Sequence, residues 1–393
     1  MRAHELLVGA LLGAVLLTQS YIDLELSADL GGWSANAPVA DLGALALIPL
    51  ALLAVARGAR PPLPGWRGYT LLLVAGALSL YGAVQPAAGL HFLIRKPLFL
   101  YVAYALGVAW AVHHLPRRWT LGLLVAWGGS TAGVSLVTSL LRIVGGDALW
   151  FSAIGGLTPN HKTLAVSLAG GLPLLIALRS RRGVPVVLAL VAVAILASAS
   201  KTAWLMAALA VSLFWPRARP LGLRWRLVVP AAVVGVALAY YAPLLLGSRA
   251  MLDAARSRHS LNRRARMMAG LHPLLGSGAG MNVFIEQVTF PDYRVNGVDA
   301  HGVIQKIGSE MGLLGLAGYG WFTFATGAAL RRRLEEEEGD ERALIYGAMA
   351  TWGVSTAGLL LSTETFSQTW WAPMAVSWGI SHHRPEELNT FNE

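Results

Sequence analysis

Long runs of apolar residues, separated by short polar segments, recur along almost the whole chain. Many are long enough to cross a hydrocarbon layer about 30 Å thick as helices, which satisfy their own backbone hydrogen bonds. The runs lie near residues 5–19, 38–56, 69–86, 95–114, 119–143, 160–178, 184–199, 202–216, 227–246, 304–330, 343–362 and 370–382. We therefore predict an all-α polytopic membrane protein with about twelve transmembrane helices and one long extracytoplasmic loop containing an amphipathic helix.

Short basic clusters alternate with these runs and predict their orientation. They are Arg57 to Arg67, Arg117-Arg118, Arg179 to Arg182, Arg217 to Arg226, and Arg331 to Arg333. Because Lys and Arg are enriched in cytoplasmic loops, we place these clusters and both termini in the cytoplasm. The chain is then divided into an N-terminal transmembrane bundle (1–246), an extracytoplasmic arginine-rich loop (247–303) and C-terminal transmembrane helices (304–393).

Composition agrees with this class. The 393 residues are 55% hydrophobic and 13% charged, whereas about 25% is usual for a soluble domain. The net charge of +10 is explained by positive cytoplasmic loops and anionic lipid headgroups, so we expect no nucleic-acid partner. The chain has no cysteine, which excludes disulfides and thiol catalysis.

The predicted extracytoplasmic loop departs from the charge rule, because it is rich in arginine. It contains Arg249, Arg256, Arg258, Arg263, Arg264, Arg266 and Arg294. The segment Asp253 to Gly270 has a helix-forming composition, which would place Arg256, Arg263 and Arg266 near one face and Arg258 away from it. Two interpretations stay open: an interfacial helix whose arginines reach lipid phosphates, or a specific phosphate or diphosphate site.

Three further segments have ordinary explanations. Gly276-Ser277-Gly278-Ala279-Gly280 lacks the Lys-Ser/Thr of a nucleotide-binding loop, and we interpret it as a flexible turn. The acidic run Leu334 to Glu341 follows three arginines and is typical of a solvated helical extension. Trp370 and Trp371 are interpreted as members of an interfacial aromatic belt.

The next apolar run begins beside a histidine and contains a deep acid. At helical spacing one stripe holds His301, Gln305, Gly308, Gly312 and Gly315. Glu310 lies more than two turns beyond His301, where a carboxylate is costly unless it is paired or faces a cavity. A histidine at the water boundary can be structural, or it can exchange protons with a substrate.

Polar residues also interrupt the predicted outer ends of other spans. They include Arg95, Asn160, Lys162 and Lys201. Each alone is compatible with interfacial anchoring, but together they favour an electropositive chamber. The outer loops contain no His-Glu-x-x-His, Asp-x-Asp or carboxylate cluster, so we expect neither a metal nor another cofactor.

The combination of these motifs resembles the O-antigen ligase/polymerase superfamily. The resemblance is strongest over residues 250–330 and consists of a loop arginine, His272 to Gly280, His301, and Glu310-Met311-Gly312-Leu313-Leu314-Gly315. Gly156 to Asn160 and Ser200 to Ala203 are weaker matches. The resemblance implies a metal-independent GT-C glycosyltransferase in the bacterial inner membrane. Such an enzyme moves a glycan from a polyprenyl (undecaprenyl) diphosphate carrier to a glycan or glycolipid acceptor.

The resemblance also implies residue roles. His301 would activate or orient the acceptor hydroxyl, and a loop arginine, Arg258 or Arg264, would hold the diphosphate. The predicted catalytic residues are His301, Arg258, Arg264 and Lys201. The predicted substrate-binding residues are Arg95, Asn160, Lys162, Arg263, Arg266 and Glu310. The chain departs from the family pattern at Gly302, where Asn is common, at Lys201, where Arg is usual, and at Asn262, where Trp is frequent.

Other functions stay open. The polar residues gather at the outer rim, whereas a transporter or flippase for an anionic lipid-linked sugar should place ionisable residues near the membrane midplane on broken helices. A non-enzymatic membrane scaffold is a further alternative. Polymerase, ligase and protein O-glycosylation activities are not distinguished by any motif in the sequence.

Overall fold

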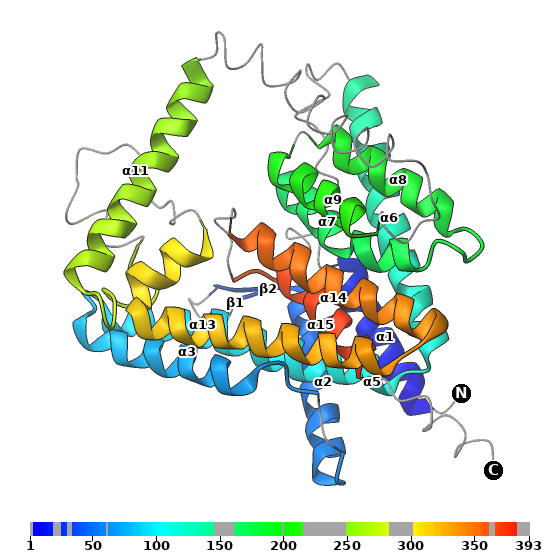
Figure 1. Ribbon diagram of the computed structural model, residues 1–393, viewed down its shortest axis with the longest axis horizontal. Coiled ribbons are helices and arrows are strands. Elements are labelled where there is room, and N and C mark those ends of the chain that lie inside the picture. Colours follow the sequence, from blue (N-terminus) through cyan, green and yellow to red (C-terminus); the bar gives the residue numbers. More distant parts are fainter. Residues whose placement is uncertain are drawn as a thin grey trace.

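The computed structural model describes residues 3–18, 25–29, 34–59, 62–144, 161–198, 200–214, 249–282, 302–360 and 366–382. Most of these residues are helical (Figure 1). The helices of the first part are α1 (Ala3–Thr18), α2 (Val39–Ala56), α3 (Trp66–Ser79), η1 (Leu80–Gly82), α4 (Pro86–Leu93), η2 (Ile94–Leu98), η3 (Tyr101–Val108), α5 (Ala109–His114) and α6 (Arg117–Val144). They are followed by α7 (His161–Ala177), α8 (Val184–Ala197), α9 (Lys201–Phe214), α11 (Arg249–Leu271), α13 (Val303–Glu336), α14 (Gly339–Leu359) and α15 (Gln368–Ser381).

Four of these helical stretches are long and apolar enough to cross a membrane. They are Val39–Ala56, Pro86–His114, Arg117–Val137 and Val303–Glu336. Shorter apolar helices cover His4–Thr18, Leu164–Ala177, Val184–Ala197 and Thr202–Phe214. These helices indicate a membrane-embedded protein, whereas the count of about twelve spans stays a prediction. The predicted span 227–246 lies outside the described residues.

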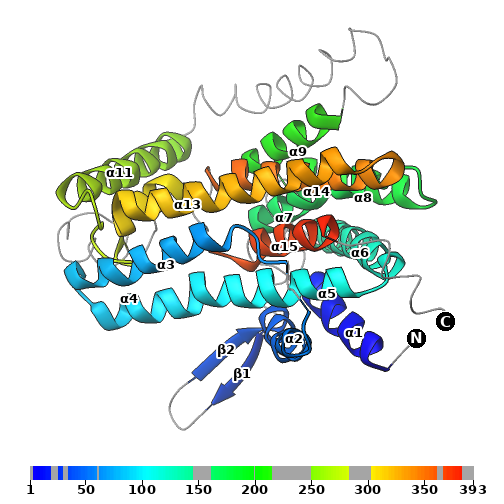
Figure 2. The same ribbon diagram turned by 60° about the horizontal axis from the view of Figure 1, so that its bottom comes forward.

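Among the described residues, one small sheet accompanies the helices of this otherwise all-helical protein. Strands β1 (Glu25–Asp29) and β2 (Ser34–Pro38) pair antiparallel, with Glu25 opposite Pro38 and Asp29 opposite Ser34. The hairpin extends away from the helices beyond the start of α2 (Figure 2). The sequence between the strands contains Gly31-Gly32, a dipeptide that is a hairpin signal. That signal could have predicted the hairpin.

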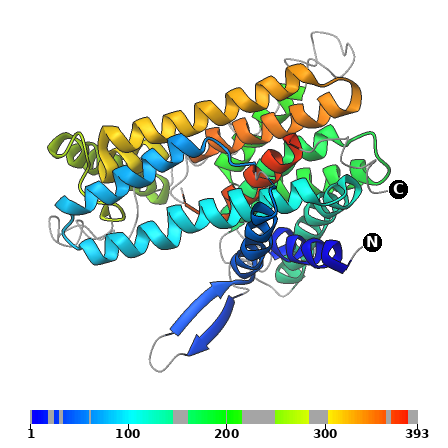
Figure 3. The same cartoon turned by 90° about the horizontal axis from the view of Figure 1, so that it is seen from below.

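Helices α3 and α13 lie side by side and run in opposite directions (Figures 1 and 3). Glycines permit the approach, because a Cβ on Gly68 would lie 2.2 Å from the backbone nitrogen of Phe322. A Cβ on Gly318 would lie 2.5 Å from the backbone nitrogen of Leu72. Small residues are typical of such close contacts between membrane helices.

The helical stretch from Pro86 to His114 begins nine residues earlier than the predicted span, which started at 95. Proline is favoured in the first helical turn, since its missing N–H would have no helical partner there. The stretch contains two π-helical segments, η2 and η3. Within η2 the carbonyl of Pro97 accepts a hydrogen bond of 2.8 Å from the Tyr69 hydroxyl, so the wider turn is tied to α3.

An aromatic cluster fills the centre of the bundle. Tyr69 and Tyr101 are stacked with ring centroids 4.2 Å apart, and Phe322 lies 6.0 Å from the ring of Trp371. Trp370 and Trp371 are only 2% and 6% exposed. Their prediction as interfacial belt residues is therefore wrong, because both side chains pack inside the protein.

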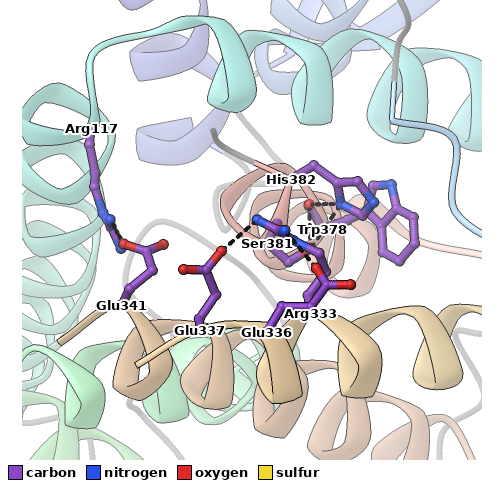
Figure 4. Close-up of polar contacts among 8 residues, drawn as sticks. All are labelled: Arg117, Arg333, Glu336, Glu337, Glu341, Trp378, Ser381 and His382. Carbon is purple, nitrogen blue, oxygen red and sulfur yellow. Dashed lines mark hydrogen bonds and ion pairs between the residues drawn. The ribbon is translucent and has the colours of Figure 1, made fainter. Parts of the chain in front are cut away.

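Charged residues from three helices meet at the end of α13 that contains Glu336. We call this region the basic end, and Figure 4 shows its contacts. It consists of Arg117, Arg333, Glu336, Glu337, Glu341, Ser381 and His382. Arg117 pairs with Glu341, and Nε of Arg333 donates to the Ser381 carbonyl at 2.9 Å. Because α13 continues to Glu336, the predicted helical extension is confirmed for the first three residues of the acidic run. The rest of the run forms the connection to α14 and the first turn of that helix.

Candidate functional site

The opposite end of α13 contains a break in the helix. Gly312 has φ 65° and ψ −162°, a backbone conformation that only glycine adopts without strain. The predicted continuous span 304–330 is therefore wrong at this point. The helix is divided into a short segment that begins at Val303 and a longer segment that packs along α3.

The glycine-rich turn after α11 fills this break with its own backbone. Four main-chain hydrogen bonds join this turn to the helical segments before and after Gly312. They run from Ser277 N–H to the Ser309 carbonyl (2.9 Å), from Gly278 N–H to the Glu310 carbonyl (3.0 Å), from Leu313 N–H to the Pro273 carbonyl (2.8 Å) and from Leu314 N–H to the Leu274 carbonyl (3.2 Å). Groups that a helix break would leave unsatisfied are thus paired, as an apolar surrounding requires.

Glycine is required at the contact between the turn and the break. Gly276 has φ +71°, and a Cβ there would lie 2.3 Å from the carbonyl carbon of Glu310. A Cβ on Gly312 would lie 2.4 Å from the carbonyl carbon of Leu274. Ala279 N–H also donates to the Ser79 hydroxyl at 3.0 Å. The interpretation of 276–280 as a flexible turn is therefore wrong, since close backbone contacts fix it to α13 and α3.

A buried ion pair lies next to the break. The Lys306 ammonium is 3.6 Å from Oε1 of Glu310, and the two side chains are 4% and 0% exposed. The same ammonium lies 4.9 Å from the centroid of the Phe92 ring, a cation–π contact. The sequence predicted that an acid at position 310 would need a partner or a cavity, and it has a partner one helical turn away.

Two neutral polar side chains extend this cluster. The backbone N–H of Asn282 donates to Oε1 of Glu310 at 3.3 Å, and the Asn282 side-chain amide donates to the Ser309 hydroxyl at 3.0 Å. Sequence reasoning did not select Lys306, Ser309 or Asn282. The signal that could have identified Lys306 is its position four residues before Glu310, on the same helix face. We call residues 273–282 and 302–314, together with Phe92, the helix-break end.

Helix α11, which contains six of the seven predicted loop arginines, packs against α13. Arg263 and Arg266 are exposed, in agreement with their predicted common face. Arg264 is 7% exposed and lies among the buried residues Leu261 and Ala265. The backbone of Arg258 lies within α11, but its side chain and that of Arg256 are not among those described. Of the arginines whose side chains are described in this helix, Arg264 is the buried one.

The remaining predicted residues are distributed over other elements. Arg95 is exposed on the π-helical segment η2. Lys162 and Lys201 lie in the first turns of α7 and α9, and their side chains are not described. Asn160 and His301 lie outside the described residues. Gly302, which follows His301 in the chain, is buried, and a Cβ there would lie 2.5 Å from the Leu360 carbonyl oxygen.

The helix-break end can stabilise charge away from water. The Lys306 ammonium and the Glu310 carboxylate of this end have little exposure, as does the Arg264 guanidinium of α11. Electrostatic interactions are stronger where water is excluded. In the part of the chain that the structure describes, no group of three or more His, Asp or Glu residues is arranged to hold a metal ion.

Neither a model of a known protein family nor a curated protein matches this chain. Its functional assignment therefore depends on its own residues and their geometry.

Proposed function

We propose that this protein is an integral-membrane glycosyltransferase. It moves a glycan from a polyprenyl-diphosphate carrier to an acceptor hydroxyl at the extracytoplasmic face of the bacterial inner membrane, without a metal. The observation that carries the proposal is the attachment of the arginine-bearing helix α11 to the broken start of α13 through the 273–278 turn. This attachment holds α11 against α13, which begins at Val303, two residues after His301.

The reaction needs charge stabilisation on the leaving group. The acceptor oxygen forms a bond to the anomeric carbon while the bond from that carbon to the diphosphate oxygen breaks. The diphosphate leaves with the bonding electron pair, and the acceptor proton passes to His301. Guanidinium groups suit the diphosphate because their paired N–H donors match phosphate oxygens. The diphosphate bond supplies the driving force, so no nucleotide is needed.

The arginines in α11 differ in burial, and we assign them different roles for that reason. Arg264, 7% exposed, lies where water is largely excluded, so its charge acts strongly on a nearby phosphate. Arg263 and Arg266 are exposed, where their attraction for the same group is screened. We therefore assign the diphosphate to Arg264, with Arg258 as its partner, and a smaller contribution to the two exposed arginines.

The cluster around Glu310 is better suited to holding the structure of the site than to taking part in the transfer reaction. Its carboxylate is 0% exposed, lies near Lys306 and accepts the backbone N–H of Asn282. A carboxylate with these contacts holds the turn against α13. We therefore propose that Glu310, first predicted to bind substrate, orients the segments that carry the other groups.

The first test is transfer from a synthetic polyprenyl-diphosphate glycan by purified protein in detergent with EDTA present. We expect His301→Ala to lower kcat by about 10² to 10⁴, the usual contribution of a general base. Arg264→Ala should lower kcat by about 10² to 10³, since it removes charge stabilisation from the leaving group. Arg263→Ala should cost less than Arg264→Ala.

The control is Arg331→Ala, because Arg331 is exposed near the basic end and pairs with Glu335. It should transfer glycan at the rate of the unchanged protein. The proposal is contradicted if folded, unchanged protein transfers no glycan to any acceptor hydroxyl, or if His301→Ala retains full turnover.

A transporter for an anionic lipid-linked sugar is the second candidate. A broken helix with a buried Lys306–Glu310 pair is a feature of many transporters. In such proteins the backbone groups freed by the helix break bind the transported molecule. Here the turn 273–278 forms hydrogen bonds with these groups instead. Movement of a fluorescent lipid-linked glycan across proteoliposomes, unaffected by His301→Ala and without transfer, would favour this candidate.

A further inference from the structure

Exposed apolar side chains surround the C-terminal end of α11. Leu271 is 75% exposed, Leu274 is 68% exposed and Met267 is 50% exposed. Large apolar residues with this exposure are unusual in an aqueous loop, and a cluster of them marks a surface that contacts something apolar. The sequence alone left open whether the helix within residues 247–303 lies at the membrane interface or forms a specific phosphate site.

This apolar surface is continuous with the outside of α13. Leu314 N–H donates to the Leu274 carbonyl, and Leu313 N–H donates to the Pro273 carbonyl, so the turn and the helix are adjacent at this point. Leu313 is 58% exposed, and α13 is long and apolar enough to cross a membrane. Exposed apolar side chains of such a helix face lipid, and Leu274 beside them faces the same medium.

The backbone of the turn also suits a position in lipid. Non-helical backbone at membrane depth is tolerated only where its polar groups are paired within the protein. The 273–278 turn has main-chain hydrogen bonds to both sides of the break in α13, and Ser277 Oγ donates a further one to the Ser309 carbonyl at 2.9 Å. The turn is therefore paired as an embedded segment requires.

The exposed arginines of α11 indicate which part of the helix lies among the lipid headgroups. Arg263 and Arg266 are exposed one to two turns before Leu271, and α11 is set obliquely to α3 and α13 (Figure 1). Long basic side chains beside an apolar surface place their charges at the phosphate level of a bilayer. The partner that matches both the apolar and the cationic residues is an amphiphile with an anionic head.

We propose that α11 and the turn after it form an interfacial membrane element. Met267, Leu271 and Leu274 contact the acyl chains of the phospholipid leaflet at the helix-break end, while Arg263 and Arg266 contact its phosphates. This placement does not depend on the proposed transferase activity. It explains why exposed arginines and exposed apolar side chains occur together at the C-terminal end of α11.

Single-cysteine spin labelling tests the placement, since the chain has no cysteine of its own. Labels are attached to Leu271→Cys and Leu274→Cys in full-length protein reconstituted in nanodiscs of phosphatidylcholine and phosphatidylglycerol. Collisions with oxygen, which concentrates in lipid, are compared with collisions with a water-soluble nickel chelate. Leu52→Cys is the lipid reference, because Leu52 is 53% exposed on the candidate span α2. Glu335→Cys is the aqueous reference, with a side chain 58% exposed.

We expect the oxygen-to-nickel ratio at 271 and 274 to match that at Leu52→Cys and to exceed that at Glu335→Cys. Replacing Arg263 and Arg266 with Gln should shift the ratio at 271 toward water. The shift should be smaller in nanodiscs of phosphatidylcholine alone, because its headgroup has a phosphate but no net negative charge. Labels at 271 and 274 with the ratio of Glu335→Cys would overturn the proposal. Each substitution removes an exposed side chain, and an unchanged melting midpoint will verify the fold.

Discussion

The helix-break end and the basic end lie near opposite ends of α13, and both contain charged side chains, but they hold them in opposite ways. Near the basic end Arg331 and Glu335 pair with side chains 75% and 58% exposed. At the helix-break end Lys306 and Glu310 pair with side chains 4% and 0% exposed. The same i, i+4 pattern in one helix therefore has two environments.

The difference in exposure changes the energetics of the pairs. Water screens the exposed charges, so such a pair contributes little to stability. A buried pair loses its hydration, which costs several kcal/mol for each ion in typical proteins, about as much as the mutual attraction returns. Burial at the helix-break end thus adds little net stability, but it fixes the turn against α13 through the contacts of Glu310 with Lys306 and Asn282.

The strongest test of the comparison is Gly276→Val. The valine would have to adopt φ +71° and place its Cβ 2.3 Å from the Glu310 carbonyl carbon. The turn would leave the break in α13, which exposes four backbone hydrogen bonds. We expect a loss of about 5 kcal/mol or more in the free energy of unfolding, enough to prevent isolation of folded protein.

Gly320→Val is the matched control, because Gly320 lies in α13, the helix that the turn contacts, with open space around its Cβ position. Size-exclusion chromatography and thermal unfolding in detergent compare the two variants. Gly276→Val with the melting midpoint of the control would show that the turn does not depend on close approach.

A smaller effect is expected from removing one partner of the buried pair. Lys306→Met leaves the Glu310 carboxylate buried without its ammonium, which should cost about 3 to 5 kcal/mol. The double variant Lys306→Met/Glu310→Leu removes both charges and should be more stable than Lys306→Met alone. Unfolding in mixed micelles with SDS measures these differences. Additive losses in the double variant would contradict an interaction between the two side chains.

The smallest effect is expected near the basic end. Arg331→Ala removes an exposed ion pair and should change the free energy of unfolding by about 0.5 kcal/mol or less. The change should decrease further at high salt, because ions screen exposed charges. The same SDS titration, repeated with added salt, checks this. A loss as large as that of Lys306→Met would remove the contrast between the two ends.

The sequence by itself determined the class of the protein and the identity of several helices. Apolar runs predicted the helices later found at Val39–Ala56 and Val184–Ala197. The composition of Asp253 to Gly270 predicted α11, and the acidic run predicted the extension of α13. The reason is that periodicity, helix propensity and the need to satisfy backbone hydrogen bonds act within one segment.

Tertiary structure decided how these segments meet. The break at Gly312 depends on a turn more than thirty residues earlier, with Ser277 and Ser309 separated by 32 positions. The same turn is bound to Ser79, 200 positions from Ala279. The burial of Trp370, Trp371 and Arg264 likewise depends on neighbours from other helices. A local pattern contains no record of such contacts, because the backbone groups and side chains that satisfy them belong to distant parts of the chain.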